Sequence, residues 1–164
     1  MVEINDRKLR ETSIFLVKLL LAGAVFRAVI FLNPETYLIQ SYLAEITKQT
    51  VNFMGLGIER DGIFLLGDGK SFVVDQDCLG WKSMSVFTAL IFASANNFLK
   101  HWKTLLTGLL ILSLANLLRV VSTVYLSYIG VISFDLIHNF LWQWGLSFIV
   151  LAVWVYWLKN IQNP

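Results

Sequence analysis

The chain has 164 residues, of which 57% are hydrophobic and 15% are charged, and its formal net charge is +2. Its mean hydropathy is +0.67. This composition is more apolar than that of ordinary soluble domains and is typical of an integral membrane protein. The small net charge and the lack of a Lys/Arg-rich block argue against nucleic acid as a partner. A single cysteine, Cys78, excludes an intramolecular disulfide.

Four apolar runs predict transmembrane helices, at residues 13–32, 81–99, 104–129 and 137–158. Basic residues precede the first run, flank the turn at residues 100–103 and follow the last run. The positive-inside rule therefore predicts cytoplasmic termini and an outer segment over residues 33–80. No internal repeat or linker divides the chain, so we expect one all-α, multi-pass domain over residues 1–164 in the cytoplasmic (inner) membrane.

The outer segment begins with a helix-start pattern, in which Asn33 is the expected N-cap, Pro34 the first helical residue and Glu35 a member of the first turn. Apolar residues then recur at helical spacing, at Ile39, Leu43, Ile46 and Phe53. This spacing predicts an amphipathic helix that lies on the outer leaflet.

Two turn signals follow, Asp61-Gly62 and Gly67-Asp68-Gly69, and they separate short β-prone runs. They predict a small hairpin or three-stranded meander. Its last strand, residues 71–74, leads the chain to Cys78.

Cys78 lies just before a helix that we expect to begin near Gly80. Unpaired N–H groups at a helix N-terminus stabilise a thiolate, and Lys82 adds positive charge one turn further on. Asp75 and Asp77 act in the opposite direction, so the sequence does not fix the pKa of the thiol. An inert small residue or a lipidated juxtamembrane cysteine would give the same pattern.

Arg119 lies inside an apolar run, with about ten apolar or small residues on either side. A guanidinium keeps its charge there, so it has to face a polar partner or a water-filled cavity. Asn116 is one turn earlier on the same helical face. A structural arginine that joins helices by hydrogen bonds is the alternative to a functional one. The expected outer end of this helix is about 15 Å above Arg119.

His138 is expected at the outer end of the last helix, where Asp135, three residues earlier, could orient its imidazole. An interfacial histidine without a catalytic role is the alternative. The topology places Cys78 and His138 at the same outer face, with Arg119 below them. A thiol, a base and a cation that stabilises an oxyanion are the groups that cysteine-dependent acyl transfer requires.

Three stretches resemble the exosortase/archaeosortase family of membrane cysteine transpeptidases: "DCLGWKS" with Cys78 and Gly80, "ANLLRVV" with Asn116 and Arg119, and "IHNFLWQWG" with His138. The resemblance covers about residues 55 to 157 and suggests a short core form. Leu79 stands where the family usually has Ser or Thr. The resemblance implies that Cys78 is the nucleophile, that Arg119 stabilises the transition state or holds a substrate carbonyl or carboxylate, and that His138 is the general acid and base.

The implied substrates are exported proteins that end in a sorting tail, made of a short motif, a transmembrane helix and basic residues. Their acceptor is an amine, a lipid or a glycan that the sequence does not identify. No metal or organic cofactor is expected, because no His/Cys/carboxylate cluster has metal-ligand spacing. Two alternatives remain. One is a catalytically inactive membrane partner in export or assembly. The other is a small transporter subunit that uses Arg119 and His138.

Overall fold

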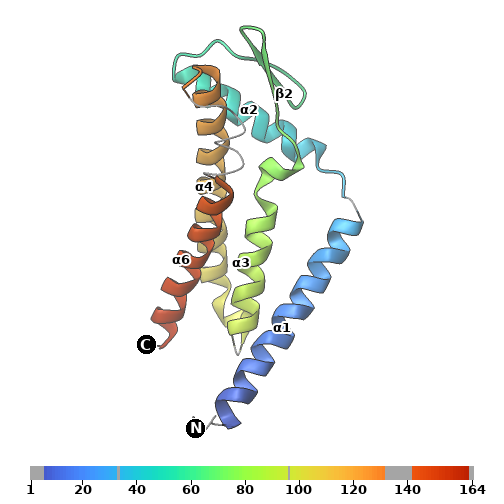
Figure 1. Cartoon of the computed structure of the whole chain (residues 1–164), viewed down its shortest axis with the longest axis vertical. Coiled ribbons are helices and arrows are strands. Elements are labelled where there is room, and N and C mark those ends of the chain that lie inside the picture. Colours follow the sequence, from blue (N-terminus) through green and yellow to red (C-terminus); the bar gives the residue numbers. More distant parts are fainter. Residues whose placement is uncertain (1–5, 33, 96, 132–141, 163–164) are drawn as a thin grey trace.

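The computed structural model describes residues 6–32, 34–95, 97–131 and 142–162 (Figure 1). Helices form a bundle, and one end of the bundle carries a crossing helix and a small sheet (Figure 1). Both ends of the chain lie at the opposite end of the bundle (Figure 1). The sheet and the chain termini are therefore separated by the length of the helices.

In the described part of the chain, the bundle is formed by the helices α1 (Asp6–Phe31), α3 (Trp81–Ser94), α4 (Trp102–Tyr128) and α6 (Trp142–Gln162). Helix α1 packs on α3, while α3, α4 and α6 pack on one another. Gly108 of α4 allows a close approach, because a Cβ there would lie 2.2 Å from the Phe87 ring of α3. Lys18 of α1 donates to the Ala95 carbonyl at the end of α3, at 3.0 Å, so this charge has a partner inside the apolar run.

Two of the described helical stretches are long and apolar enough to cross a membrane, Lys8–Phe31 and Phe98–Tyr128, and Trp144–Lys159 is a shorter apolar helix. The four predicted spans are therefore not confirmed. The span predicted over 81–99 differs most, because α3 ends at Ser94 and a separate 3-10 helix, η2 (Phe98–His101), leads into α4. With 14 residues, α3 is about 21 Å long, short of the ~30 Å hydrocarbon core.

The other boundaries shift by smaller amounts. Helix α1 begins at Asp6 rather than at residue 13, because the Lys-, Arg- and Glu-rich residues before the apolar run also favour helix. Helix α4 begins at Trp102 and ends at Tyr128, close to the predicted 104–129. Residues 137–141 of the last predicted span lie outside the described part, and α6 continues to Gln162.

The crossing helix α2 (Tyr37–Phe53) starts later than the sequence predicts. Its N-cap is Thr36, whose side chain makes no capping hydrogen bond, whereas Pro34 and Glu35 are not helical. Asn33, the predicted N-cap, lies outside the described residues. Residues 34–36 lie where the chain changes direction from α1 to α2, so the helix begins only after them (Figure 1).

The face that α2 buries is made of small residues, Ala44, Thr47 and Val51, and it packs on α4. Small side chains let the two helix backbones approach closely. By contrast, Ile39 is 59% exposed and Phe53 is 93% exposed. The apolar spacing in the sequence therefore marks the outward face of α2, and only Leu43 of the predicted set packs partly against the core.

The predicted meander is confirmed as a three-stranded antiparallel sheet in the order β1-β2-β3. Its strands are β1 (Glu59–Asp61), β2 (Phe64–Gly67) and β3 (Lys70–Val73). The two tight turns carry positive φ angles at Gly62, Asp68 and Gly69, as the turn signals predict. Strand β3 ends one residue earlier than expected.

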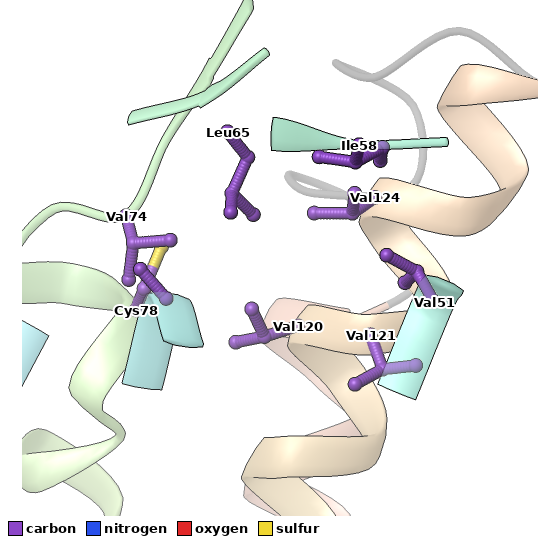
Figure 2. Packing of buried hydrophobic residues seen from close by; sticks show 9 residues of the cluster. Val51, Ile58, Leu65, Val74, Cys78, Val120, Val121 and Val124 are labelled. Carbon is purple, nitrogen blue, oxygen red and sulfur yellow. The ribbon is translucent and has the colours of Figure 1, made fainter. Parts of the chain in front are cut away.

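The sheet, α2 and the last turns of α4 enclose an outer core (Figure 2). Its fully buried members are Ala44, Val51, Ile58, Leu65, Val74, Cys78, Val120, Val121 and Val124. Arg60 of β1 fastens the sheet to α2 through Glu45, at 2.6 Å, and Lys70 of β3 donates to the Tyr128 carbonyl of α4, at 2.7 Å. The outer core thus fixes β3 and the turn that follows it relative to α4.

Candidate functional site

Cys78 lies in a short 3-10 helix, η1 (Gln76–Leu79), between the sheet and α3. Asp75 caps this turn, because its carboxylate accepts the Cys78 backbone N–H at 3.0 Å. The cysteine is only 8% exposed, and its side chain belongs to the outer core beside Val74 (Figure 2). The sole thiol is therefore held in a fixed and buried position.

Asn116 of α4 binds this turn, because its side-chain amide donates to the Cys78 carbonyl oxygen at 2.8 Å. Asn116 is buried, and Gly80 leaves room for it. A Cβ at Gly80 would lie 2.6 Å from Cγ of Asn116, and the positive φ of 71° also favours glycine. A glycine two residues after Cys78 thus allows the turn that carries the cysteine to contact Asn116 of α4 directly.

Arg119 lies one turn beyond Asn116 on the same helix and reaches the same turn. One of its terminal nitrogens, Nη2, is 3.5 Å from the carbonyl oxygen of Asp77. Arg119 and Cys78 both line one small pocket, whose other residues are Phe72, Val73, Val74, Val120, Thr123 and Val124. The structure therefore brings together the thiol and the guanidinium that the sequence predicts to meet.

Arg119 and Cys78 meet although the sequence predicts the outer end of the arginine's helix to be about 15 Å above Arg119. Helix α4 does not have to bend to bring Arg119 to the thiol, because Cys78 lies beside Asn116 and Arg119, more than two turns before the end of the helix. The helix continues for about 13 Å beyond Arg119 to Tyr128, and these last turns pack against the sheet and α2. Arg119 therefore lies next to the outer core, directly before Val120 and Val121, on the part of α4 that packs against the sheet and α2.

Burial raises the pKa of the Cys78 thiol to about 11, and the negative charge of Asp75 and its hydrogen bond with the thiol act in the same direction. The positive charge of Arg119 lowers this pKa but does not outweigh them. Lys82 points elsewhere, since its ammonium is 2.6 Å from the Asp77 carboxylate and both side chains are largely exposed. Without a further group, the thiol is neutral at neutral pH.

Two predicted site residues, His138 and Asp135, lie outside the described residues, so their placement relative to Cys78 stays a prediction. Two described residues at the site were not predicted as members: Asp75, which touches the thiol, and Thr123, which lines the pocket and donates to the Arg119 carbonyl at 2.8 Å. An acidic residue three positions before Cys78 is an N-cap pattern and could have revealed Asp75. No sequence signal marks Thr123.

The fold and this site define a helical membrane protein that holds a thiol beside an arginine at one end of its bundle. The family model for transmembrane exosortases (Exosortase_EpsH) matches residues 6–158. The chain belongs to this family, which confirms the resemblance and extends it to the N-terminal helix. Membership implies a membrane cysteine peptidase or transpeptidase in general. Neither the curated proteins nor the solved structures include a significant match.

Proposed function

We propose that this protein cleaves C-terminal sorting tails from exported proteins and transfers the shortened proteins to an acceptor through a thioester on Cys78. The observation that carries the proposal is the shared pocket of Cys78 and Arg119. Asn116 strengthens it, because this residue ties the cysteine turn to the helix that carries the arginine. Such a fixed pair suits a reaction in which charge develops on an oxygen next to the nucleophile.

In the proposed reaction, the Cys78 thiol gives its proton to His138 as the sulfur attacks the scissile carbonyl carbon of the tail, and the carbonyl oxygen becomes an oxyanion beside Arg119. The oxyanion then collapses and the C–N bond breaks. The leaving amine takes up a proton from the imidazolium of His138, and a thioester remains on Cys78. An acceptor amine or hydroxyl attacks the thioester, gives its proton to His138 and releases the thiolate.

The high pKa of Cys78 defines what the base has to do. With a pKa of about 11, roughly one thiol in ten thousand is ionised at neutral pH. The thiol proton of Cys78 therefore has to leave as the substrate binds, and we propose that His138 accepts it. In the free protein, the Asp75 carboxylate accepts a hydrogen bond from the Cys78 thiol. This hydrogen bond keeps the thiol protonated until the base is in place.

We further propose that the pocket opens to the outer side of the cell membrane and that both termini are cytoplasmic. The outward apolar face of α2, with Ile39 and Phe53, would then lie on the outer leaflet. This placement is supported by the arrangement of the molecule, in which the sheet lies at one end and both termini at the other (Figure 1), and by the pocket, which is lined by Phe72 and Val73 of the sheet.

The test is co-expression with an exported reporter whose C-terminal tail is taken from a protein of the same genome and consists of a short motif, an apolar helix and basic residues. We expect the wild-type chain to release the tail, as detected by mass spectrometry of the reporter. Cys78→Ala should abolish release, and Arg119→Lys should slow it by about 100-fold, because lysine keeps the charge but not the planar fork.

The same variants separate the alternatives. An inactive assembly partner would tolerate Cys78→Ala, and a transporter subunit would depend on Arg119 and His138 but not on Cys78. Cys78→Ser is the matched control for packing, since it keeps the size of the side chain but not the thiol. Failure of the wild type to cleave any such reporter, or continued cleavage by Cys78→Ala, overturns the proposed function.

A further inference from the structure

We propose that the open edge of β3 binds the substrate segment that precedes the transmembrane helix of the tail, as a fourth strand that runs parallel to β3. This inference rests on the proposed function and adds how the substrate is held. The occupant is an extended peptide, bound mainly through its backbone and then led toward Cys78. Binding by strand addition uses main-chain hydrogen bonds for affinity.

The register of the sheet shows which backbone groups of β3 are available. Val74 N–H donates to the Ile63 carbonyl at 2.9 Å, and the pairing continues as Phe64 with Val73 and Leu65 with Phe72. In an antiparallel ladder, alternate residues bond to the partner strand and the others point away from it. The N–H and C=O groups of Ser71 and Val73 therefore point away from β2.

The outer edge of β3 has no strand beside it in the part of the chain that the structure describes. Ser71 is exposed, and the Val73 side chain is 45% exposed. Unpaired edges of this kind accept a further strand unless charges or a proline block them. Lys70 is the only charged residue of β3, and its ammonium is engaged with the end of α4 at the Ser127 and Tyr128 carbonyls.

The edge leads directly into the candidate site. Val73 is the last residue of β3 and lines the pocket together with Cys78 and Arg119. Val74 follows and is buried next to Cys78 (Figure 2). A peptide on this edge therefore passes from the hydrogen-bonding groups of Ser71 and Val73 to the pocket that Cys78 lines.

The direction of the substrate follows from the chain order. Strand β3 runs from the tip of the sheet toward the start of α3, which continues into the bundle (Figure 1). A sorting tail also runs from the exported domain toward its own membrane helix. The two chains therefore point the same way, and the pairing is parallel. Ser71 and Val73 then offer two N–H and two C=O groups to the peptide.

A proline at Ser71 tests the edge, because it removes one outward N–H and leaves the bonds between β2 and β3 intact. Proline is tolerated in edge strands when its nitrogen faces away from the sheet. With the tailed reporter, we expect Ser71→Pro to slow tail release by about tenfold, which is the effect of one lost hydrogen bond. Ser71→Ala changes the same side chain but keeps the backbone N–H, so it should slow tail release much less than Ser71→Pro does. Equal rates for the two variants overturn the edge proposal.

Photo-crosslinking gives a second measurement that depends neither on catalysis nor on the folding of the proline variant. In a Cys78→Ala background, a benzophenone amino acid replaces Ser71 in one protein and Glu59, on the opposite edge of the sheet, in another. We expect the reporter to be captured from position 71 and not from position 59. If the wild type cleaves the reporter but position 71 captures no more than position 59, the edge proposal is wrong. If the wild type does not cleave it, the proposed function has failed instead.

Discussion

Cys78 is in an environment that suppresses its reactivity. It is buried in the outer core, and the Asp75 carboxylate both caps its turn and hydrogen-bonds the thiol. Arg119 is the only contributor among the named charges that favours the thiolate. A thiolate is oxidised more readily than a thiol. Under the proposed function, a cysteine that ionises only when substrate is bound is therefore protected from oxidation between turnovers.

The pH dependence of alkylation tests this description. Because the pKa of Cys78 is raised to about 11, the reaction of detergent-solubilised protein with iodoacetamide should accelerate about tenfold per pH unit between about pH 7 and pH 9, without a plateau. Asp75→Asn removes the negative charge but keeps an oxygen that can accept the Cys78 N–H. It should lower the pKa, so that the rate at neutral pH rises and a plateau appears at lower pH.

Asp77→Asn is the matched control, since Asp77 is next to Cys78 in sequence but is exposed and paired with Lys82. Its profile should stay close to that of the wild type. A wild-type plateau near the ordinary thiol pKa of about 8.5, unchanged in Asp75→Asn, would contradict the assignment.

The sequence predicts which residues belong to the site better than it predicts how they act. The order and spacing of Cys78, Gly80, Asn116 and Arg119 indicate a common site, and the structure brings these four together. The effect of the helix N-terminus on the thiol could not be weighed from sequence, because burial depends on packing between distant segments. The position of Cys78 along α4 could not be predicted for the same reason, because it also depends on packing between distant segments.

At the scale of elements, the contact between η1 and α4 depends on the missing side chain of Gly80. Gly80→Ala should push the cysteine turn away from Asn116, since the new Cβ would lie 2.6 Å from Cγ. We expect a loss of about 1–3 kcal/mol of stability in addition to the penalty for a positive φ. Thermal unfolding in detergent measures the stability, and tail release from the reporter measures the effect on the site.

Gly69→Ala is the control, because Gly69 has a similar φ of 73° and no atom within 4 Å of its added Cβ. It should show the backbone penalty alone and retain activity. In addition, Gly80→Ala combined with Asn116→Ala should cost less than the sum of the two single changes, since the obstructing side chain is gone. Equal destabilisation by Gly80→Ala and Gly69→Ala would show that the contact is unimportant.

The elements illustrate where apolar patterns mislead in a membrane protein. In α2, the large apolar residues face outward and the buried face is made of Ala44, Thr47 and Val51. Because lipid accepts large apolar side chains as readily as a protein core does, hydrophobic periodicity does not identify the buried side. The meander was predictable because its turns depend on local backbone geometry, which Gly and Asp residues reveal directly.

At the scale of the whole molecule, α4 belongs to both halves of the protein. Val120, Val121 and Val124 are part of the outer core, while Leu112 packs with α3 and α6 in a second cluster. One continuous helix therefore connects the pocket to the bundle. This arrangement sets the two ends of the molecule on opposite sides of any membrane that the bundle crosses.

Cysteine labelling in intact cells tests the orientation. In a Cys78→Ala background, a new cysteine at Asp61, the exposed last residue of β1 before the turn to β2, should react with a membrane-impermeant maleimide. A cysteine at Lys103, an exposed residue in the first turn of α4, should react only after the cells are permeabilised. The reverse pattern would mean that the sheet faces the cytoplasm, and the proposed substrates could not reach the pocket.

The unequal lengths of α3 and α4 have a further consequence. Helix α3 is about 21 Å long and α4 about 40 Å, and Cys78 lies directly before α3. The height of the thiol is thus set by the protein, whereas the cleavage point of a tailed substrate, under the proposed function, would follow the membrane that the substrate's own helix spans. Acyl-chain length therefore becomes a variable of the reaction, and short-chain lipids should bring the cleavage point and the thiol to the same level.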